Sequence, residues 1–189
     1  MGVIYMKILN FGSLNIDYVY SVDHFVQKGE TISSSQMNIF SGGKGLNQST
    51  ALGRAGAQVF HAGRIGKGGE FLVEQLKEAG VNTDLIVLDS QCSTGHAIIQ
   101  NDAEGDNCIL LYGGANQRIT KEQIDATLDQ FDAGDYLVLQ NETSNLPYLM
   151  EKAAEKQMKI VLNPSPMDEK IKALPLDKVT LFFVNEIEA

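Results

Sequence analysis

A turn of two glycines and a lysine, Gly42-Gly43-Lys44, stands directly before a helix-like run and could bind a polar ligand. The backbone N–H groups at a helix N-terminus are free to donate to oxygen atoms, and Lys44 adds a positive charge. Asn47 follows about one helical turn later with both a donor and an acceptor. Glycines before a helix also serve simple close packing, so the pattern alone leaves binding and packing open.

The spacing around this turn excludes the two common nucleotide-binding motifs. A P-loop needs a lysine followed by Ser or Thr, whereas Lys44 is followed by Gly45. A dinucleotide-binding loop needs a glycine where Gln48 stands. If the turn binds a ligand, we therefore expect a polar ligand other than a nucleotide phosphate.

A second polar cluster, Asn15 and Asp17, follows the first apolar run. Residues two apart point to the same side of an extended chain, so the amide and the carboxylate can lie together. Open α/β sheets bind ligands beyond the carboxyl ends of their strands, and this pair lies beyond the end of the expected strand 7–11. A carboxylate that accepts from two vicinal hydroxyls suits a sugar, whereas an Asx-type turn is the structural alternative.

Short apolar runs that alternate with helical patterns must position these residues. The runs are apolar throughout, as in strands covered on both faces, and their alternation with helices predicts an α/β fold with a largely parallel sheet. We expect strands at 7–11, 58–65, 84–88, 136–140, 159–163 and 180–185, with helices at 69–79, from a capping box at Thr120 and Gln123, and around 147–158.

Two segments interrupt this alternation. Residues 17–40 and 94–112 look like antiparallel strands that form a small separate sheet. The sequence stops just after the strand expected at 180–185, where a covering helix would normally follow. We therefore expect residues 1–189 to be the N-terminal part of one longer domain.

Charge and hydropathy limit the function classes. The chain has 24 acidic and 15 basic residues and a formal net charge of −9, which argues against nucleic acid as a partner. It lacks the basic leader and long apolar core of a signal peptide, and no apolar stretch is long enough to span a membrane. We expect a cytoplasmic protein with no membrane partner.

Several motifs occur together in the order found in one family of sugar kinases. They are "GSLNIDYV", "GGKGLNQSTALGRAGAQV", "TGHAII" with "LLYGGAN", "LQNE", "LNPSP" and "VNEIEA". The chain resembles the ribokinase/phosphofructokinase-B family along nearly its whole length. The resemblance implies a three-layer Rossmann-like ribokinase fold with a small β-sheet lid, formed at about 17–40 and 94–112, which closes on the sugar and makes a homodimer.

The resemblance also implies roles for individual residues. The residues that would bind the sugar are Asn15, Asp17, Gly43, Lys44, Asn47 and Glu142. Asn185 and Glu188 match an Asn-x-x-Glu element that acts near the nucleotide phosphates, with Glu188 acting indirectly on the metal. The implied cofactors are ATP and Mg²⁺, with a monovalent cation such as K⁺ as a further one.

The implied reaction is transfer of the γ-phosphoryl group of ATP to the primary hydroxyl of a sugar, with D-ribose giving ribose 5-phosphate as the first expectation. Another sugar or a nucleoside is the alternative within the family. The Gly-Ala-Gly-Asp segment that supplies the family's catalytic base has no match here, so we expect the base beyond Ala189 and no turnover from these residues alone. If the chain is complete, it would instead be a non-catalytic sugar-binding module.

Overall fold

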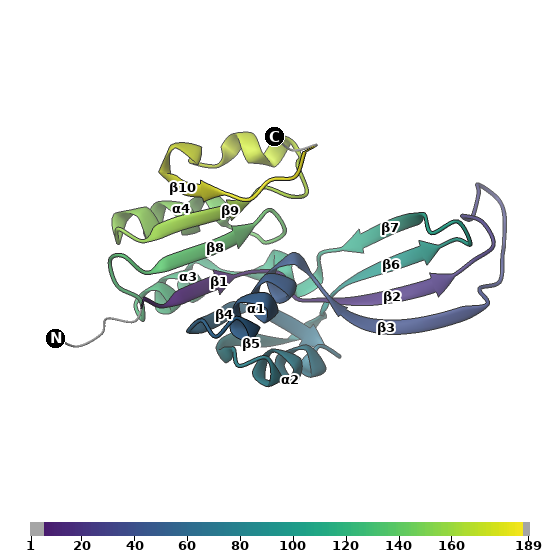
Figure 1. Cartoon of the computed structure of the whole chain (residues 1–189), viewed down its shortest axis with the longest axis horizontal. Helices are drawn as coiled ribbons and strands as arrows, with labels where there is room; N and C mark the ends of the chain where they lie inside the picture. Colours follow the sequence, from purple (N-terminus) through teal and green to yellow (C-terminus); the bar gives the residue numbers. More distant parts are fainter. Residues whose placement is uncertain (1–5, 187–189) are drawn as a thin grey trace.

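Two β-sheets organise the chain in the computed structural model, which describes residues 6–186 (Figure 1). The larger sheet has six strands, in the spatial order β10 (Val179–Phe182), β9 (Lys159–Asn163), β8 (Tyr136–Gln140), β1 (Ile8–Phe11), β4 (Val59–Lys67) and β5 (Asn82–Ser93). All of its strand pairs are parallel. The predicted α/β fold with a largely parallel sheet is confirmed.

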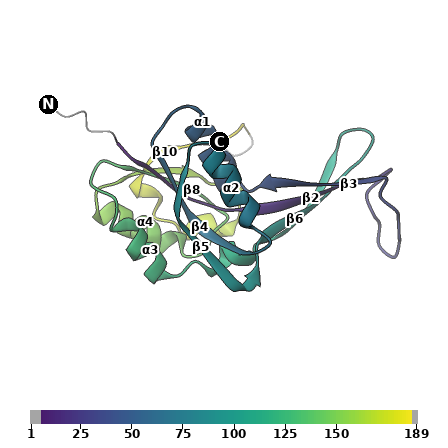
Figure 2. The same ribbon diagram turned by 90° about the horizontal axis from the view of Figure 1, so that it is seen from below.

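Helices cover both faces of this sheet and make three layers (Figure 2). The helices on one face are α1 (Lys44–Arg54) and α2 (Glu70–Glu78), and those on the other are α3 (Lys121–Leu128) and α4 (Leu146–Glu155). Successive strand residues point to opposite faces, so Leu9, Phe11 and Leu139 are buried against α3 and α4. A second core, which includes Leu46 and Leu72, lies beneath α1 and α2. None of the described helices is long and apolar enough to cross a membrane.

The predicted capping box at the start of α3 forms only in part. The Thr120 side chain accepts from the Gln123 N–H at 3.2 Å, as expected for an N-cap. The Gln123 side chain, however, donates to the Gly63 carbonyl at 2.8 Å and accepts from Arg64 at 3.1 Å. Because Gln123 is used to fasten α3 to β4, the reciprocal bond that a capping box requires is missing.

The smaller sheet projects from one end of the larger one (Figure 1). Its spatial order is β3 (Gln36–Gly42), β2 (Asn15–Ser21), β6 (Gly95–Asn101) and β7 (Asn107–Tyr112). The expected antiparallel pairing holds for β2 with β3 and for β6 with β7, but β2 and β6 are parallel. The prediction was wrong at this join because β2 and β6 each follow a strand of the larger sheet, β1 and β5, and so leave the body in the same direction.

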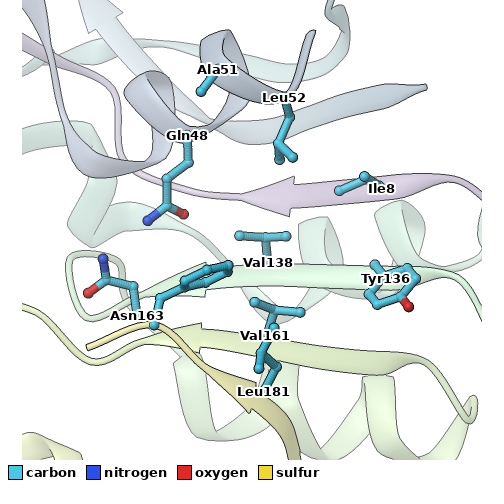
Figure 3. A pocket seen from close by; sticks show the side chains of 10 residues that line it. Ile8, Gln48, Ala51, Leu52, Tyr136, Val138, Val161, Asn163 and Leu181 are labelled. Atoms are coloured by element: carbon cyan, nitrogen blue, oxygen red, sulfur yellow. The ribbon is translucent and has the colours of Figure 1, made fainter. Parts of the chain in front are cut away.

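Part of the larger sheet is left open on the α1 side. A groove of about 430 Å³ runs between α1 and strands β8, β9 and β10 (Figure 3). Its lining is largely apolar, with Leu52 of α1 on one side and Val138 and Val161 on the sheet. Leu181 at its edge is 50% exposed. The described residues thus leave a strip of the sheet without a covering helix.

Candidate functional site

The glycine turn meets the carboxyl ends of β1 and β8, and a buried carboxylate joins them. Glu142 follows β8, and its side chain is only 6% exposed. It accepts from the Lys44 backbone N–H at 3.1 Å and from the Lys44 ammonium at 3.0 Å. The Ser13 hydroxyl also donates to it. Three donors therefore hold the charge of Glu142 in place, and one of them is the first N–H of helix α1.

Glycine is required at this turn by backbone conformation and by space. Gly43 has φ 94°, a region that L side chains rarely adopt, and a Cβ there would lie 2.8 Å from the Ser13 carbonyl oxygen. A Cβ on Gly45 would lie 2.4 Å from the Ser13 nitrogen. The absence of these side chains lets Gly45 donate to the Ser13 hydroxyl at 3.2 Å. The turn is therefore pressed against the segment that leads from β1 to β2.

Asp17 lies on the other side of the same turn. A Cβ on Gly42 would come within 2.1 Å of its carboxylate, so that carboxylate occupies the space which glycine leaves. Burial raises the pKa of Asp17, and the nearby charge of Glu142 raises it further, while Lys44 opposes both. The Lys44 ammonium is thus paired with Glu142 and acts on Asp17 only through its charge.

Asn15 is held between two glycines at the base of the smaller sheet. Its neighbours across the sheet are Gly42 on β3 and Gly95 on β6. A Cβ on Gly95 would lie 2.4 Å from the Asn15 side-chain oxygen, and that oxygen accepts from Asn116 at 2.8 Å. Asn15 and Asp17 therefore lie on the same face of β2, as the two-residue spacing predicted.

A cavity of about 300 Å³ opens beside this cluster. Of the residues predicted to bind the sugar, Asn15 and Glu142 line it, whereas Asp17, Gly43 and Lys44 lie at the turn itself. Other polar residues that line it are Asn116, Gln117, Asn141, Asp168 and Lys170. Asn47 is exposed on α1 and does not line it. The structure thus brings the predicted residues to one end of the sheet but divides them between a cavity and a turn.

One of the two residues expected at the nucleotide lies beside β10, the edge strand of the larger sheet. Asn185 is exposed and follows β10, and Glu188 lies outside the described residues. Within residues 6–186, no group of three or more His, Cys, Asp or Glu side chains could hold a metal ion.

Three residues of the site were missed from the sequence. Ser13 bridges the turn to Glu142, Asn116 bonds Asn15, and Gln117 donates to the Glu142 carbonyl at 2.7 Å. Asn116 and Gln117 belong to the 3₁₀ helix η1 (Gly114–Arg118), which follows β7. The only local signal for them was the Gly-Gly-Ala-Asn run after a strand, which indicates a turn but no contact.

Comparisons with known proteins identify the family to which the chain belongs. The family described as "pfkB family carbohydrate kinase" matches residues 6–189. A ribokinase of Staphylococcus aureus is 35% identical, with 97% of this chain and 62% of that protein covered. A deoxyribokinase of Salmonella typhi is 27% identical, with 97% and 61% covered.

A solved structure gives the same answer for the fold. The crystal structure of a ribokinase from Cryptococcus neoformans in complex with ADP superposes with a TM-score of 0.81 at 35% identity, covering 97% of this chain and 57% of that one. The chain therefore spans about three-fifths of the length of these relatives. By the family match along almost the whole of its length, the chain belongs to the pfkB family of carbohydrate kinases.

Proposed function

We propose that the protein containing this chain is an ATP-dependent sugar kinase that phosphorylates the primary hydroxyl of D-ribose to give ribose 5-phosphate. The observation that carries the proposal is the cluster of Asp17, Lys44 and Glu142 around the glycine turn, in a chain of the carbohydrate kinase family. The ribokinases among its relatives favour ribose as the sugar.

The charge balance of the cluster suits a neutral ligand with many hydroxyl groups. Asp17 and Glu142 supply acceptors for hydroxyl protons, and the single ammonium of Lys44 does not outweigh their two negative charges. An anionic ligand would be repelled by this net charge, whereas hydroxyl groups gain charge-assisted hydrogen bonds from it. Asn15 adds an amide at the edge of the adjoining cavity.

Glu142 is a residue of the cluster that can accept a hydrogen bond from a sugar hydroxyl. It already accepts from Ser13, from the Lys44 N–H and from the Lys44 ammonium. A carboxylate has about four acceptor positions. A sugar hydroxyl can take the remaining position, or it can replace the ammonium, because the Lys44 side chain is 37% exposed and can turn toward the sugar. Catalysis then depends on how firmly the cluster orients the sugar, because phosphoryl transfer is governed mainly by positioning and charge.

ATP and its magnesium belong to the reaction as the source of the phosphoryl group and the charge that neutralises it. The Cryptococcus relative is described as a complex with ADP. In this chain, Asn185 is the described residue that we assign to the nucleotide phosphates, together with Glu188. We assign the catalytic base to sequence beyond Ala189.

We assign the smaller sheet the role of a lid and of a dimer interface. Its strands begin or end at Asn15, Gly42 and Gly95, beside the candidate sugar site. It exposes apolar side chains that a monomer would leave in water. These are Met37, Ile39, Phe40, Ile98, Ile109, Leu110, Leu111 and Tyr112. Sedimentation equilibrium tests this, because Leu110→Lys should convert a dimer to a monomer without changing the free energy of unfolding of the monomer.

The open strip of the larger sheet is the natural place for additional chain to pack. Strands β8, β9 and β10 present Val138, Val161 and Leu181 to the groove on the α1 side. We propose that further sequence of the native protein covers this strip with an apolar helix face. The intact mass of the native protein tests the idea, because a native mass equal to that of 189 residues would contradict it.

A phosphorylation assay on the native protein tests the function. We expect ATP-dependent product with D-ribose, and 2-deoxyribose is the second substrate to examine because a relative is a deoxyribokinase. Asn47→Ala should weaken sugar binding if this exposed residue turns toward the sugar on closure. A native protein that forms no product with any pentose, hexose or nucleoside would refute the kinase assignment. Sugar binding without product would favour the non-catalytic module.

A further inference from the structure

Asn116 is a buried side chain whose hydrogen bonds all go to the first residues of the candidate sugar site. It is 1% exposed. Its oxygen accepts from the Leu14 N–H at 3.0 Å, and its nitrogen donates to the Leu14 carbonyl at 3.2 Å and to the Asn15 side-chain oxygen at 2.8 Å. One amide therefore holds both the backbone before Asn15 and the Asn15 side chain.

The bond from Asn116 to Asn15 determines which end of the Asn15 amide is free. The Asn15 oxygen is already used as an acceptor, so its NH₂ group is the end left for other partners. Asn15 is 4% exposed and lines the 300 Å³ cavity together with Asn116. A hydroxyl oxygen in that cavity would therefore meet a donor rather than an acceptor.

Asn116 itself is anchored independently of Asn15. Its backbone N–H donates to the Gly113 carbonyl at 3.1 Å, and its own carbonyl accepts from the Ser144 N–H at 3.1 Å. Ser144 follows Glu142 in the chain, and Gln117 donates to the Glu142 carbonyl at 2.7 Å. The short helix η1 thus touches both sides of the candidate site, Asn15 through Asn116 and the Glu142 backbone through Gln117.

We propose that Asn116 is a positioning residue for sugar binding, which fixes the Asn15 amide with its NH₂ group directed to a sugar oxygen. The proposal rests on the proposed function, since it concerns the same sugar. Gly95 is part of the device, because a Cβ there would lie 2.3 Å from the Asn116 nitrogen and 2.4 Å from the Asn15 oxygen. Asn116→Asp and Gly95→Ala should therefore disturb the same contact from opposite sides.

The experiment is a double-mutant cycle on sugar affinity in the native protein, measured by calorimetry with D-ribose and no nucleotide. Asn116→Asp keeps the acceptor for the Leu14 N–H but places a carboxylate against the Asn15 oxygen. We expect it to raise the Kd for ribose about tenfold, as loss of one buried hydrogen bond does. In an Asn15→Ala background, Asn116→Asp should change the Kd for ribose little further, because Asn116 acts on the sugar through the Asn15 side chain.

Leu128→Ala is the control for general destabilisation. Leu128 is 2% exposed in α3, away from the cavity, and its truncation should lower the free energy of unfolding while the Kd for ribose stays the same. Asn116→Ser, which keeps one donor, replaces Asn116→Asp if that variant does not fold. An unchanged Kd in a folded Asn116 variant, or effects that add in full to those of Asn15→Ala, would overturn the proposal.

Side-chain amide NMR separates this inference from the proposed function. The NH₂ resonances of Asn15 should shift in Asn116→Asp and in Gly95→Ala even without sugar, because the contact is present in the sugar-free protein. A wild-type protein that binds no sugar would refute the proposed function. Asn15 resonances that stay unchanged in both variants would refute the positioning role itself.

Discussion

A buried histidine gives the protein a specific sensitivity to acid. His61 on β4 is fully buried, and its Nδ1 lies 2.7 Å from the Ser49 hydroxyl of α1. Burial lowers the pKa of His61 to about 4, although the Gly12 carbonyl opposes the shift. The imidazole is therefore neutral in the folded protein at every pH at which an exposed histidine gains its proton.

The magnitude follows from the two pKa values. With about 6.5 in the unfolded chain and about 4 in the folded one, the unfolded state binds more protons between these pH values, so stability falls as the pH falls through this window. From about pH 7.5 to about pH 5, the free energy of unfolding should drop by ~2 kcal/mol because of His61 alone. The full loss, below about pH 4, approaches ~3 kcal/mol.

Urea denaturation at a series of pH values measures this. His61→Gln can keep a hydrogen bond to Ser49 but has no proton to gain, so its stability should fall ~2 kcal/mol less than that of wild type over the same interval. Its lower starting stability does not affect this comparison of slopes. Parallel curves for wild type and His61→Gln would refute the reasoning.

Three further substitutions test the turn. Lys44→Met should lower the free energy of unfolding by about 1–3 kcal/mol in urea titrations, because it leaves buried Glu142 without its ammonium partner. An unchanged free energy of unfolding in this variant would contradict the prediction. Gly43→Ala should lower it by at least ~1 kcal/mol, since φ is 94° and the Ser13 carbonyl lies 2.8 Å from the new Cβ. Asp17→Asn should raise stability at neutral pH, because the raised pKa means that the charged form is disfavoured in the folded state above about pH 4. Calorimetry should show that Asp17→Asn also weakens ribose binding by at least about tenfold.

The larger sheet was predictable because its signals are local. Strands β8 and β9 have the bounds expected from their apolar runs, since a short run that is buried on both faces is distinct from its polar surroundings. β5 is longer than expected, Asn82–Ser93 instead of 84–88, because its second half is half-exposed and pairs with the end of β4. Polar residues in an exposed half-strand have no periodicity that identifies them as a strand.

From the residues alone, a site residue could be predicted only where its type stands out from its sequence neighbours. Lys44 in a glycine turn could be identified as a candidate on those grounds, and Glu142 came from the family resemblance alone. Ser13 and Asn116 have common residue types, and their importance depends on partners 129 and 102 residues away. Such contacts depend on the tertiary fold, and the local spacing of residues in the sequence does not predict them.

The sequence left two alternatives for the glycine turn, close packing and ligand binding. In the structure the turn packs tightly and also holds the carboxylate of Glu142. Gly43 is the N-cap of α1 and has no side chain to accept from the first N–H groups, and Glu142 accepts from one of them instead. A carboxylate near a helix N-terminus interacts favourably with the helix dipole, and its three donors hold Glu142 in place before any ligand arrives. Glu142→Gln should therefore reduce both sugar affinity and the free energy of unfolding, whereas Asp17→Asn should reduce affinity while it raises the free energy of unfolding. Calorimetry and urea denaturation on the two variants measure these two effects separately. A Glu142→Gln protein with the wild-type free energy of unfolding would refute the role of Glu142 in stabilising the fold.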